Sequence, residues 1–341
     1  MKETSYAAGK LPHAELSRLL AAYTHSTAKD LIVPPSLGED AAVIDFGDRY
    51  LVVKTDPITF ATDSIGSYAV HVNANDIAAM GATPRFFLST VLLPTGAATP
   101  QSVEAIFRSI HTAATSLGIV VCGGHTEITH GIDRPIVIGQ MLGEVAPEQL
   151  VRSSGLRPGD DLILTKGMGI EATAIIARDK REDLLKRGYT SSRIDRCADF
   201  LSDPGISAVR DAQVATQAGR VTAMHDPTEG GVATGLYELA SASDVGLDIN
   251  GDALLLMEET DQLCAEYGLD PFGIISSGAM LIGADPASTE DIVHALARAG
   301  IAASPIGRVC EKDFGLQISH RGTRSALPYF TTDEITRLFS T

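Results

Sequence analysis

The stretch Ala69-Val-His-Val-Asn-Ala-Asn-Asp-Ile-Ala-Ala-Met-Gly81 is the one around which the rest of the chain is arranged. Its residues Val70, Ala74 and Ile77 recur at helical spacing, which predicts a helix with one apolar face. Gly81 supplies the end of that helix, because glycine tolerates the left-handed cap conformation. The alanines between these positions let other elements approach the helix closely.

Three polar residues, Asn73, Asn75 and Asp76, lie in the middle of this apolar helix. A buried carboxylate is costly unless it is paired or bound to a metal. Taken alone, such a residue more often caps a neighbouring loop than binds a ligand. Further carboxylates on either side of the helix favour the ligand interpretation.

Length, charge and cysteine content narrow the class of protein. The chain has 341 residues, enough for two domains, and its net charge of −16 disfavours nucleic acid or an anionic membrane as a partner. A phosphate ligand would therefore need metal cations as intermediaries. The four cysteines are scattered, which favours a reducing compartment over a disulfide framework or a zinc site. With no signal-like or membrane-spanning run, we expect a cytoplasmic location.

The order of predicted elements indicates a mixed α+β or α/β protein with helices on one face of a sheet and the other face free for a partner. In the first half we predict helices over 12–23, 69–81 and 100–117, and strands over 41–46, 50–55, 86–93, 119–122 and 135–145. In the second half we predict strands over 162–165, 221–225, 279–282 and 306–309, and helices over 170–178, 192–201, 204–218, 289–299 and from Gly231 to 242.

A polar, turn-rich stretch around residues 151–160 separates the two halves. We therefore predict an N-terminal segment with one helix over 1–34, a first domain over 35–150 and a second domain over 151–341.

Acidic residues stand at the ends of several predicted elements. Glu39 and Asp40 precede a strand, Asp56 ends one, and His125 with Glu127 follows another. Carboxylates grouped in this way suit Mg²⁺, which prefers oxygen ligands and often bridges substrate phosphates. The sequence has no Gly-x4-Gly-Lys-Ser/Thr loop, so metals and loops would have to hold any nucleotide.

Each of these motifs is ordinary by itself, but their order and spacing resemble one superfamily. It includes aminoimidazole ribonucleotide synthetase, thiamine-monophosphate kinase, selenophosphate synthetase and the hydrogenase-maturation protein HypE. The matching stretches are Gly38-Glu-Asp-Ala-Ala-Val43, Lys54-Thr-Asp56, Asn73-Ala-Asn-Asp-Ile-Ala-Ala-Met-Gly81, Gly123-Gly-His-Thr-Glu127, Arg157-Pro-Gly-Asp160, His225-Asp-Pro-Thr-Glu-Gly-Gly231 and Ser276-Ser-Gly278.

The resemblance implies a two-domain fold like that of aminoimidazole ribonucleotide synthetase (PurM). The first α/β domain would pair into a β-barrel across a homodimer, the second would form an α/β sandwich, and ATP and Mg²⁺ would bind near the interface. It implies metal ligands at Glu39, Asp40, Asp56, Asp76 and Asp226. It implies catalytic roles for Asp56, His125 and Asp226, and cofactor contacts from Lys54, Thr55, Asn73, Gly123, Gly124, Glu127, Thr228 and Glu229.

The sequence departs from the family pattern in four places. Glu39 replaces the usual first aspartate of Gly-Asp-Asp, and His125 replaces the aspartate of Gly-Asp-Thr, which leaves the number of metals open. HypE proteins end in a flexible tail with a terminal cysteine, whereas this sequence ends in Leu-Phe-Ser-Thr341. Lys10 stands where selenophosphate synthetase has a lysine beside a reactive cysteine, but no cysteine accompanies it here.

These departures leave three functions open. The first is an ATP- and Mg²⁺-dependent enzyme of the HypE-like branch that activates an amide- or carboxylate-type oxygen of a small-molecule or protein acceptor. The second is a phosphotransferase like selenophosphate synthetase or thiamine-monophosphate kinase. The third is a nucleotide-binding partner protein that has kept the dimer and lost the chemistry.

Overall fold

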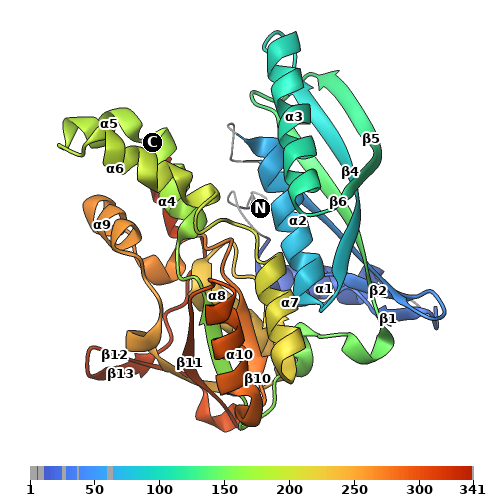
Figure 1. The fold of residues 1–341 in the computed structure, drawn as a ribbon, viewed down its shortest axis with the longest axis vertical. Helices are drawn as coiled ribbons and strands as arrows, with labels where there is room; N and C mark the ends of the chain where they lie inside the picture. The colour runs from blue at the N-terminus through green and yellow to red at the C-terminus, as the bar shows by residue number, and fades with distance from the viewer. Residues whose placement is uncertain (1–5, 7–10, 25–27, 37, 60–63, 340–341) are drawn as a thin grey trace, which may run out of the picture.

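The computed structural model places two β-sheets side by side, with helices packed on and between them (Figure 1). It describes residues 6, 11–24, 28–36, 38–59 and 64–339. Among these residues, no helix is both long enough and apolar enough to cross a bilayer.

The first sheet has six strands and is covered by helices on one face. Its strands are β1 (Leu31–Val33), β2 (Ala42–Asp45), β3 (Tyr50–Ile58), β4 (Thr83–Pro94), β5 (Val120–Thr129) and β6 (Ile136–Val145), in the order β1-β2-β3-β6-β4-β5. Only β4 and β5 pair in parallel. Helices α2 (Ile65–Ala79) and α3 (Pro100–Ser116) lie along the same face of this sheet, and α1 (His13–Tyr23) precedes it (Figure 1).

Alternation along the strands gives this sheet two unlike faces. The inner face, toward α2 and α3, carries fully buried residues such as Val52, Phe87 and Met141. The outer face carries apolar side chains that are only half-buried or exposed: Leu51, Val53, Phe86, Leu88, Leu92, Ile138 and Leu142. The sequence prediction of one helix-covered face and one open face agrees with this arrangement.

The second sheet has seven strands in the order β13-β12-β9-β11-β7-β10-β8. They are β7 (Asp161–Thr165), β8 (Val221–His225), β9 (Gly246–Asn250), β10 (Leu281–Ala284), β11 (Ala303–Cys310), β12 (Leu316–His320) and β13 (Thr323–Ala326). The helices of this half are α4 (Ile170–Asp179), α5 (Arg181–Lys186), α6 (Ser191–Ala198), α7 (Val209–Ala218), α8 (Gly231–Ser243), α9 (Glu258–Tyr267) and α10 (Pro286–Arg298).

Both faces of the second sheet are buried by helices. Ile163 and Ile282 point into a core shared with α7 and α10, whereas Leu162 and Leu281 point into a core shared with α8. Because neighbouring residues of one strand enter different cores, these strands appear in the sequence as continuous apolar runs.

Helix α2 lies at the junction of the two halves and is buried on almost every side. It packs on the first sheet and also against α7 of the second half (Figure 1). Asn75 links the halves directly: its Nδ2 donates to the Ile206 carbonyl at 2.9 Å, and its Oδ1 accepts from the Ala208 N–H at 2.7 Å. The sequence predicted a single apolar face, and the structure shows a more completely buried helix.

The helix predicted over 204–218 begins only at Val209, and the prediction around β5 was also wrong. The stretch from Gly123 to Glu127 was expected to follow a strand, but it lies inside β5. Gly124 has a packing reason there, since a Cβ atom at this residue would lie 2.1 Å from the Ser89 carbonyl oxygen on β4. A stretch that resembles a flexible loop is thus a strand that must approach its neighbour closely.

Candidate functional site

The inner face of β3 and the buried helix α2 together position one half of the candidate site. Lys54 and Asp56 are two residues apart on β3, so both project from its inner face toward α2. Lys54 Nζ lies 3.1 Å from Asp76 Oδ1 and 3.9 Å from Asp56 Oδ2. Asp76 is only 4% exposed, and its Oδ2 has no hydrogen-bond partner among the described residues.

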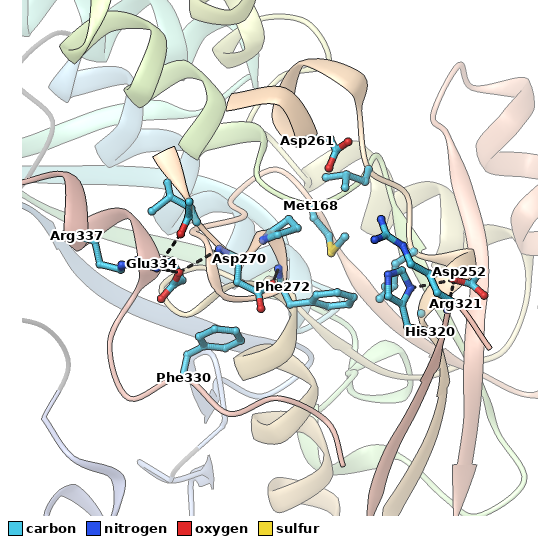
Figure 2. A pocket seen from close by; sticks show the side chains of 16 residues that line it. Met168, Asp252, Asp261, Asp270, Phe272, His320, Arg321, Phe330, Glu334 and Arg337 are labelled. Atoms are coloured by element: carbon cyan, nitrogen blue, oxygen red, sulfur yellow. Dashed lines mark hydrogen bonds and ion pairs between the residues drawn. The ribbon is translucent and has the colours of Figure 1, made fainter. Parts of the chain in front are cut away.

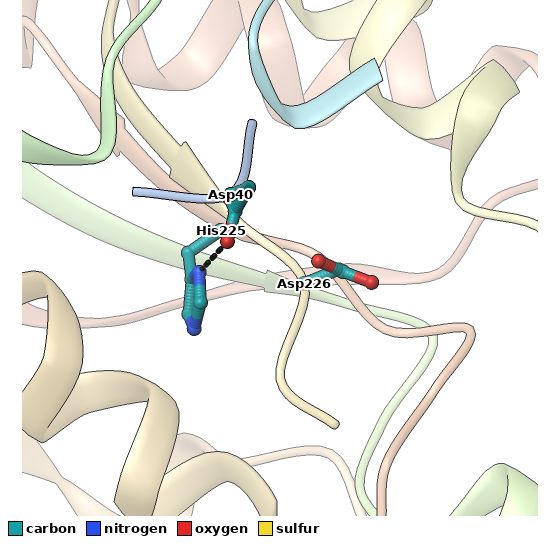
Figure 3. Close-up of side chains that lie close together, drawn as sticks. All are labelled: Asp40, His225 and Asp226. Atoms are coloured by element: carbon teal, nitrogen blue, oxygen red, sulfur yellow. Dashed lines mark hydrogen bonds and ion pairs between the residues drawn. The ribbon is translucent and has the colours of Figure 1, made fainter. Parts of the chain in front are cut away.

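The other half of the site forms where the loop before β2 meets the end of β8. Asp40 Oδ1 lies 2.6 Å from His225 Nδ1, across 185 residues of sequence (Figure 3). Ser153 donates to Asp40 Oδ2 at 3.2 Å, and Glu238 Oε2 lies 2.9 Å from His225 Nε2. Both ring nitrogens of His225 are therefore engaged by carboxylates, so this side chain is held as a positioning group and has no nitrogen left for a metal.

Asp226 completes the cluster. It is 2% exposed, and its Oδ2 has no hydrogen-bond partner among the described residues. One side-chain donor atom each from Asp40, His225 and Asp226 lies within 4.8 Å of the other two (Figure 3). Burial, and then the charges of Asp76 and Asp40, raise the pKa of Asp226 well above its ordinary value.

Two cations offset part of this negative charge. Burial alone would lower the pKa of Lys54, but Asp76, Asp56, Asp40 and Asp226 together raise it above its ordinary value. For His225, burial again acts to lower the pKa, and Asp40 and Glu238 raise it well above the ordinary value. Lys54 and His225 are therefore both charged at neutral pH, and they pair with part of the carboxylate cluster.

The donor set fits Mg²⁺. The side chains that face one another are carboxylates, and Asp76 and Asp226 each keep a buried oxygen without a partner in the described structure. Hard oxygen ligands of this kind are those that Mg²⁺ binds, usually together with phosphate oxygens and water. The site therefore has both the chemistry and the unused oxygens that a divalent cation requires.

The other predicted site residues on the inner face of the first sheet and in the loops beside it make hydrogen bonds to the backbone or to neighbouring side chains. Asn73 Nδ2 donates to the carbonyls of Ala69 at 2.9 Å and Asp56 at 3.3 Å, which holds the end of β3 against α2. Thr228 and Glu229 lie in the loop between Asp226 and α8, where the Thr228 carbonyl accepts from Gly231 N–H. Glu39 Oε1 accepts a hydrogen bond from Ser154, and its buried Oε2 has no hydrogen-bond partner among the described residues.

A second set of predicted site residues lies on the outer face of the first sheet, opposite the face that carries Lys54 and Asp56. Thr55, Gly123, His125 and Glu127 belong to the outer face, and β5 is separated from β3 by β6 and β4. His125 is exposed and lies 3.5 Å from Glu127, measured from Nε2 to Oε2. Within one chain these residues do not join the carboxylate cluster. Gly124, another predicted cofactor contact, lies beside them in β5. Lys10, the lysine near the N-terminus, falls outside the described residues.

Sequence reasoning missed the residues that orient the cluster. His225 stood in a matched motif, but its pairing with Asp40 and Glu238 is visible only in three dimensions. Ser153 was treated as part of a polar linker. The sequence feature that could have identified His225 is its position, because it directly precedes Asp226 at the end of a predicted strand.

A separate cavity of about 760 Å³ lies in the second half (Figure 2). Met168, Phe272 and Phe330 contribute apolar surface, and Asp252 pairs with His320 at its rim. None of the carboxylates described above lines it. The cavity is thus distinct from the candidate site.

Family models match most of the chain. "AIR synthase related protein, N-terminal domain" matches residues 38–145, and "AIR synthase related protein, C-terminal domain" matches residues 157–319. Among curated relatives, the carbamoyl dehydratase HypE of Cupriavidus necator is 30% identical, over 76% of this chain and 70% of that protein. A putative hydrogenase expression/formation protein of Methanocaldococcus jannaschii is 27% identical, over 76% of this chain and 75% of that protein.

Solved structures share the fold. HypE in complex with ATP superposes with a TM-score of 0.72 and 22% identity, over 96% of this chain and 97% of that one. A chain of a HypE–HypF complex superposes with a TM-score of 0.75 and 21% identity, over 93% of this chain and 100% of that one. The predicted family resemblance and the mixed α/β fold with two sheets are confirmed.

Proposed function

Because this chain belongs to the AIR synthase related protein family, we propose that it is an ATP- and Mg²⁺-dependent enzyme that transfers a phosphoryl group to an amide- or carboxylate-type oxygen. The observation that carries the proposal is the buried carboxylate cluster between the two sheets, with unused oxygens on Asp76 and Asp226. The HypE relative that binds ATP supports the choice of nucleotide. The acceptor is a small molecule or a protein.

In this proposal Asp40, Asp56, Asp76 and Asp226 hold Mg²⁺, which when bound neutralises the charge of the phosphates. Lys54, held between Asp56 and Asp76, faces the same space and adds a positive charge toward the transferred phosphoryl group. His225 and Ser153 fix the orientation of Asp40. Catalysis then rests on positioning and charge neutralisation, which supply most of the acceleration in phosphoryl transfer.

Titration with ATP tests this proposal. We expect ATP to bind in the presence of Mg²⁺ and to bind at least tenfold more weakly when EDTA removes the metal, as measured by isothermal titration calorimetry. Phosphorus NMR on the same sample, after addition of a panel of amides and small anions as acceptors, is expected to show ADP or AMP. Failure to bind ATP with Mg²⁺ would overturn the proposal, and tight binding without product over a panel of amides and small anions would support a non-catalytic nucleotide-binding role instead.

We also propose that the chain forms a homodimer through the outer face of the first sheet. The face carries a continuous set of half-buried apolar side chains, from Val53 and Leu142 to Leu88 and Leu92, and single chains rarely leave such a surface open. Pairing two copies there would cover this surface and enclose Thr55, His125 and Glu127.

Sedimentation equilibrium tests the dimer. We expect a mass of twice the 35.9 kDa chain for the unmodified protein and a shift to monomer in Ile138→Lys, whose side chain lies on the outer face. Phe107→Lys is the matched control, because Phe107 is an exposed apolar residue on α3. A monomer in the unmodified protein would contradict this interface.

A further inference from the structure

Two of the carboxylates that the proposed function gives to Mg²⁺ come from different halves of the chain. Asp76 lies on α2, which packs on the first sheet, whereas Asp226 directly follows β8 of the second sheet. A cation that both carboxylates contact can be coordinated only as closely as the separation of the two halves allows. The contacts that fix this separation therefore decide which cation the site fits.

Asn75, the neighbour of Asp76 in α2, holds the second half from one side. Its side chain is fully buried, and both polar atoms of its amide bond to the backbone of the segment 205–208. Nδ2 donates to the Ile206 carbonyl at 2.9 Å, and Oδ1 accepts from the Ala208 N–H at 2.7 Å. Because these groups lie on either side of residue 207, the amide holds the segment in one orientation.

Lys166 holds the same segment from the other side. Its Nζ donates to the carbonyls of Ser207 at 2.5 Å and Gly278 at 3.2 Å, and it lies 3.0 Å from Asp211 Oδ2. These three acceptors match the three N–H donors of an ammonium group. The side chains of Lys166 and Asp211 are 8% and 1% exposed. The ammonium is therefore buried, paired and held in one geometry.

The backbone around Lys166 is constrained to allow these contacts. Lys166 has a φ of +55°, in the left-handed region that glycine adopts far more readily than lysine. Strain of this kind persists where the surrounding structure imposes it. Gly278 approaches the same segment closely, since a Cβ atom there would lie 2.7 Å from the Gly205 carbonyl oxygen. The position keeps a lysine despite the strain, which indicates that its side chain is needed.

Lys166 and Asp226 share one edge of the second sheet. They directly follow β7 and β8, and both of these strands pair antiparallel with β10, which lies between them. Leu164 of β7 and His225 of β8 are both in register with Leu281 of β10. These two residues are therefore two strand spacings apart, or roughly 10 Å. Two rows of backbone hydrogen bonds thus tie the position of Lys166 to that of Asp226.

We propose that Asn75 and Lys166 are positioning residues: together they fix the separation of the two ligand carboxylates and so make the site prefer Mg²⁺ over the larger Ca²⁺. The path runs from Asp76 through Asn75, the segment 205–208 and Lys166 to the sheet edge that carries Asp226. Mg²⁺ requires short bonds in near-ideal octahedral geometry, whereas Ca²⁺ accepts longer bonds and irregular geometry. Loosening the path therefore costs Mg²⁺ more than Ca²⁺. This inference rests on the proposed function and adds the origin of its metal specificity.

Calorimetric titration with ATP in saturating Mg²⁺ or saturating Ca²⁺ tests the inference through the ratio of the two affinities. We expect the unmodified protein to bind ATP more tightly with Mg²⁺. Asn75→Ala removes both hydrogen bonds to the segment 205–208, so the ratio of Mg²⁺ to Ca²⁺ affinity is expected to fall roughly fivefold. An unchanged ratio in this variant would overturn the role of Asn75.

A double variant separates position from stability at Lys166. Lys166→Met alone would leave Asp211 buried without its cation, which is strongly destabilising. Lys166→Met/Asp211→Leu removes both charges, and replacing a buried ion pair by apolar residues of similar volume is often neutral. We expect its thermal unfolding to stay near that of the unmodified protein while the affinity ratio still falls roughly fivefold, because nothing holds the Ser207 carbonyl. An unchanged ratio would overturn the role of Lys166, and this variant decides the inference if Asn75→Ala does not fold.

Thr289→Val is the control for a loss of stability alone. Thr289 of α10 donates to Asp161 Oδ2 at 2.8 Å, at the end of β7 opposite Lys166. Its loss should lower the unfolding temperature and leave the affinity ratio unchanged. An equal fall of the ratio in this variant would show that the ratio follows stability, and would overturn the inference.

The outcomes separate this inference from the proposed function. If the unmodified protein bound ATP with neither cation, both proposals would be overturned. If it bound MgATP and the ratio stayed the same in Asn75→Ala and in the double variant, the proposed function would stand and the positioning role would be overturned.

Discussion

Replacing Asp226 by asparagine is expected to weaken MgATP binding roughly a hundredfold, or about 2.7 kcal/mol, while leaving the fold in place. Asp226 is buried and its Oδ2 has no partner in the described structure, so this oxygen is available to a metal and to nothing else nearby. Asparagine keeps the shape but loses the charge that a divalent cation needs. Isothermal titration calorimetry with MgATP measures the loss.

The same variant changes the pH dependence of binding. Since burial and then the charges of Asp76 and Asp40 raise the pKa of Asp226, metal binding competes with protonation of this carboxylate. MgATP affinity in the unmodified protein should therefore rise with pH, with proton release visible as a dependence of the measured enthalpy on the buffer. In Asp226→Asn the proton release should fall.

Asp291→Asn is the matched control, because Asp291 is exposed on α10 and far from the cluster in sequence. It should bind MgATP as the unmodified protein does. If Asp226→Asn also retained full affinity, Asp226 would not be a metal ligand.

Replacing Lys54 by methionine is expected to lower the free energy of unfolding of the metal-free protein by about 3–5 kcal/mol at pH 8, the usual cost of leaving a buried charge unpaired. Lys54 Nζ lies 3.1 Å from Asp76 Oδ1, and without it the buried carboxylates face one another with no cation between them. Urea unfolding followed by circular dichroism measures the difference.

The loss of stability in Lys54→Met should depend on pH and on Mg²⁺. Burial raises the pKa of Asp76 to about 7, although the charge of Lys54 lowers it. Without Lys54 this pKa rises further, so near neutral pH the folded state holds a proton that the unfolded chain has lost. Stability therefore falls as pH rises, and the defect is smaller at pH 5 than at pH 8. Added Mg²⁺ should restore most of the lost stability by taking over the charge. Lys186→Met, at an exposed lysine of α5, is the control: its free energy of unfolding should depend on neither pH nor Mg²⁺ more than that of the unmodified protein. If Lys54→Met unfolded at pH 8 without Mg²⁺ with the same free energy as the unmodified protein, the charge balance described here would be refuted.

Much of the fold follows from local patterns. The apolar runs at residues 162–165 and 221–225 predict strands, and the structure has them as β7 and β8 of the second sheet, where both faces are buried. Strands β9, β12 and β13 and helix α9 were not predicted, since their patterns are short or polar and tertiary packing forms them. Helix α2 was expected from residue 69, but it begins at Ile65.

The candidate site was predictable only in part. The motifs supplied Asp40, Asp76 and Asp226, whose carboxylates the fold brings near one another. Alternation along β3 places Lys54 and Thr55 on opposite faces, a distinction that a short motif does not express.

Electron–nuclear double resonance with Mn²⁺ in place of Mg²⁺ tests the central claim, that the buried aspartates between the two sheets hold a metal bound to ATP. The protein is labelled with ¹³C at the aspartate carboxyl carbons, and Mn²⁺ and ATP are added. The account predicts couplings of the bound Mn²⁺ both to phosphorus and to ¹³C, with the ¹³C signal reduced in Asp226→Asn. Coupling to phosphorus without any coupling to ¹³C would show that ATP carries its metal elsewhere and would contradict the account.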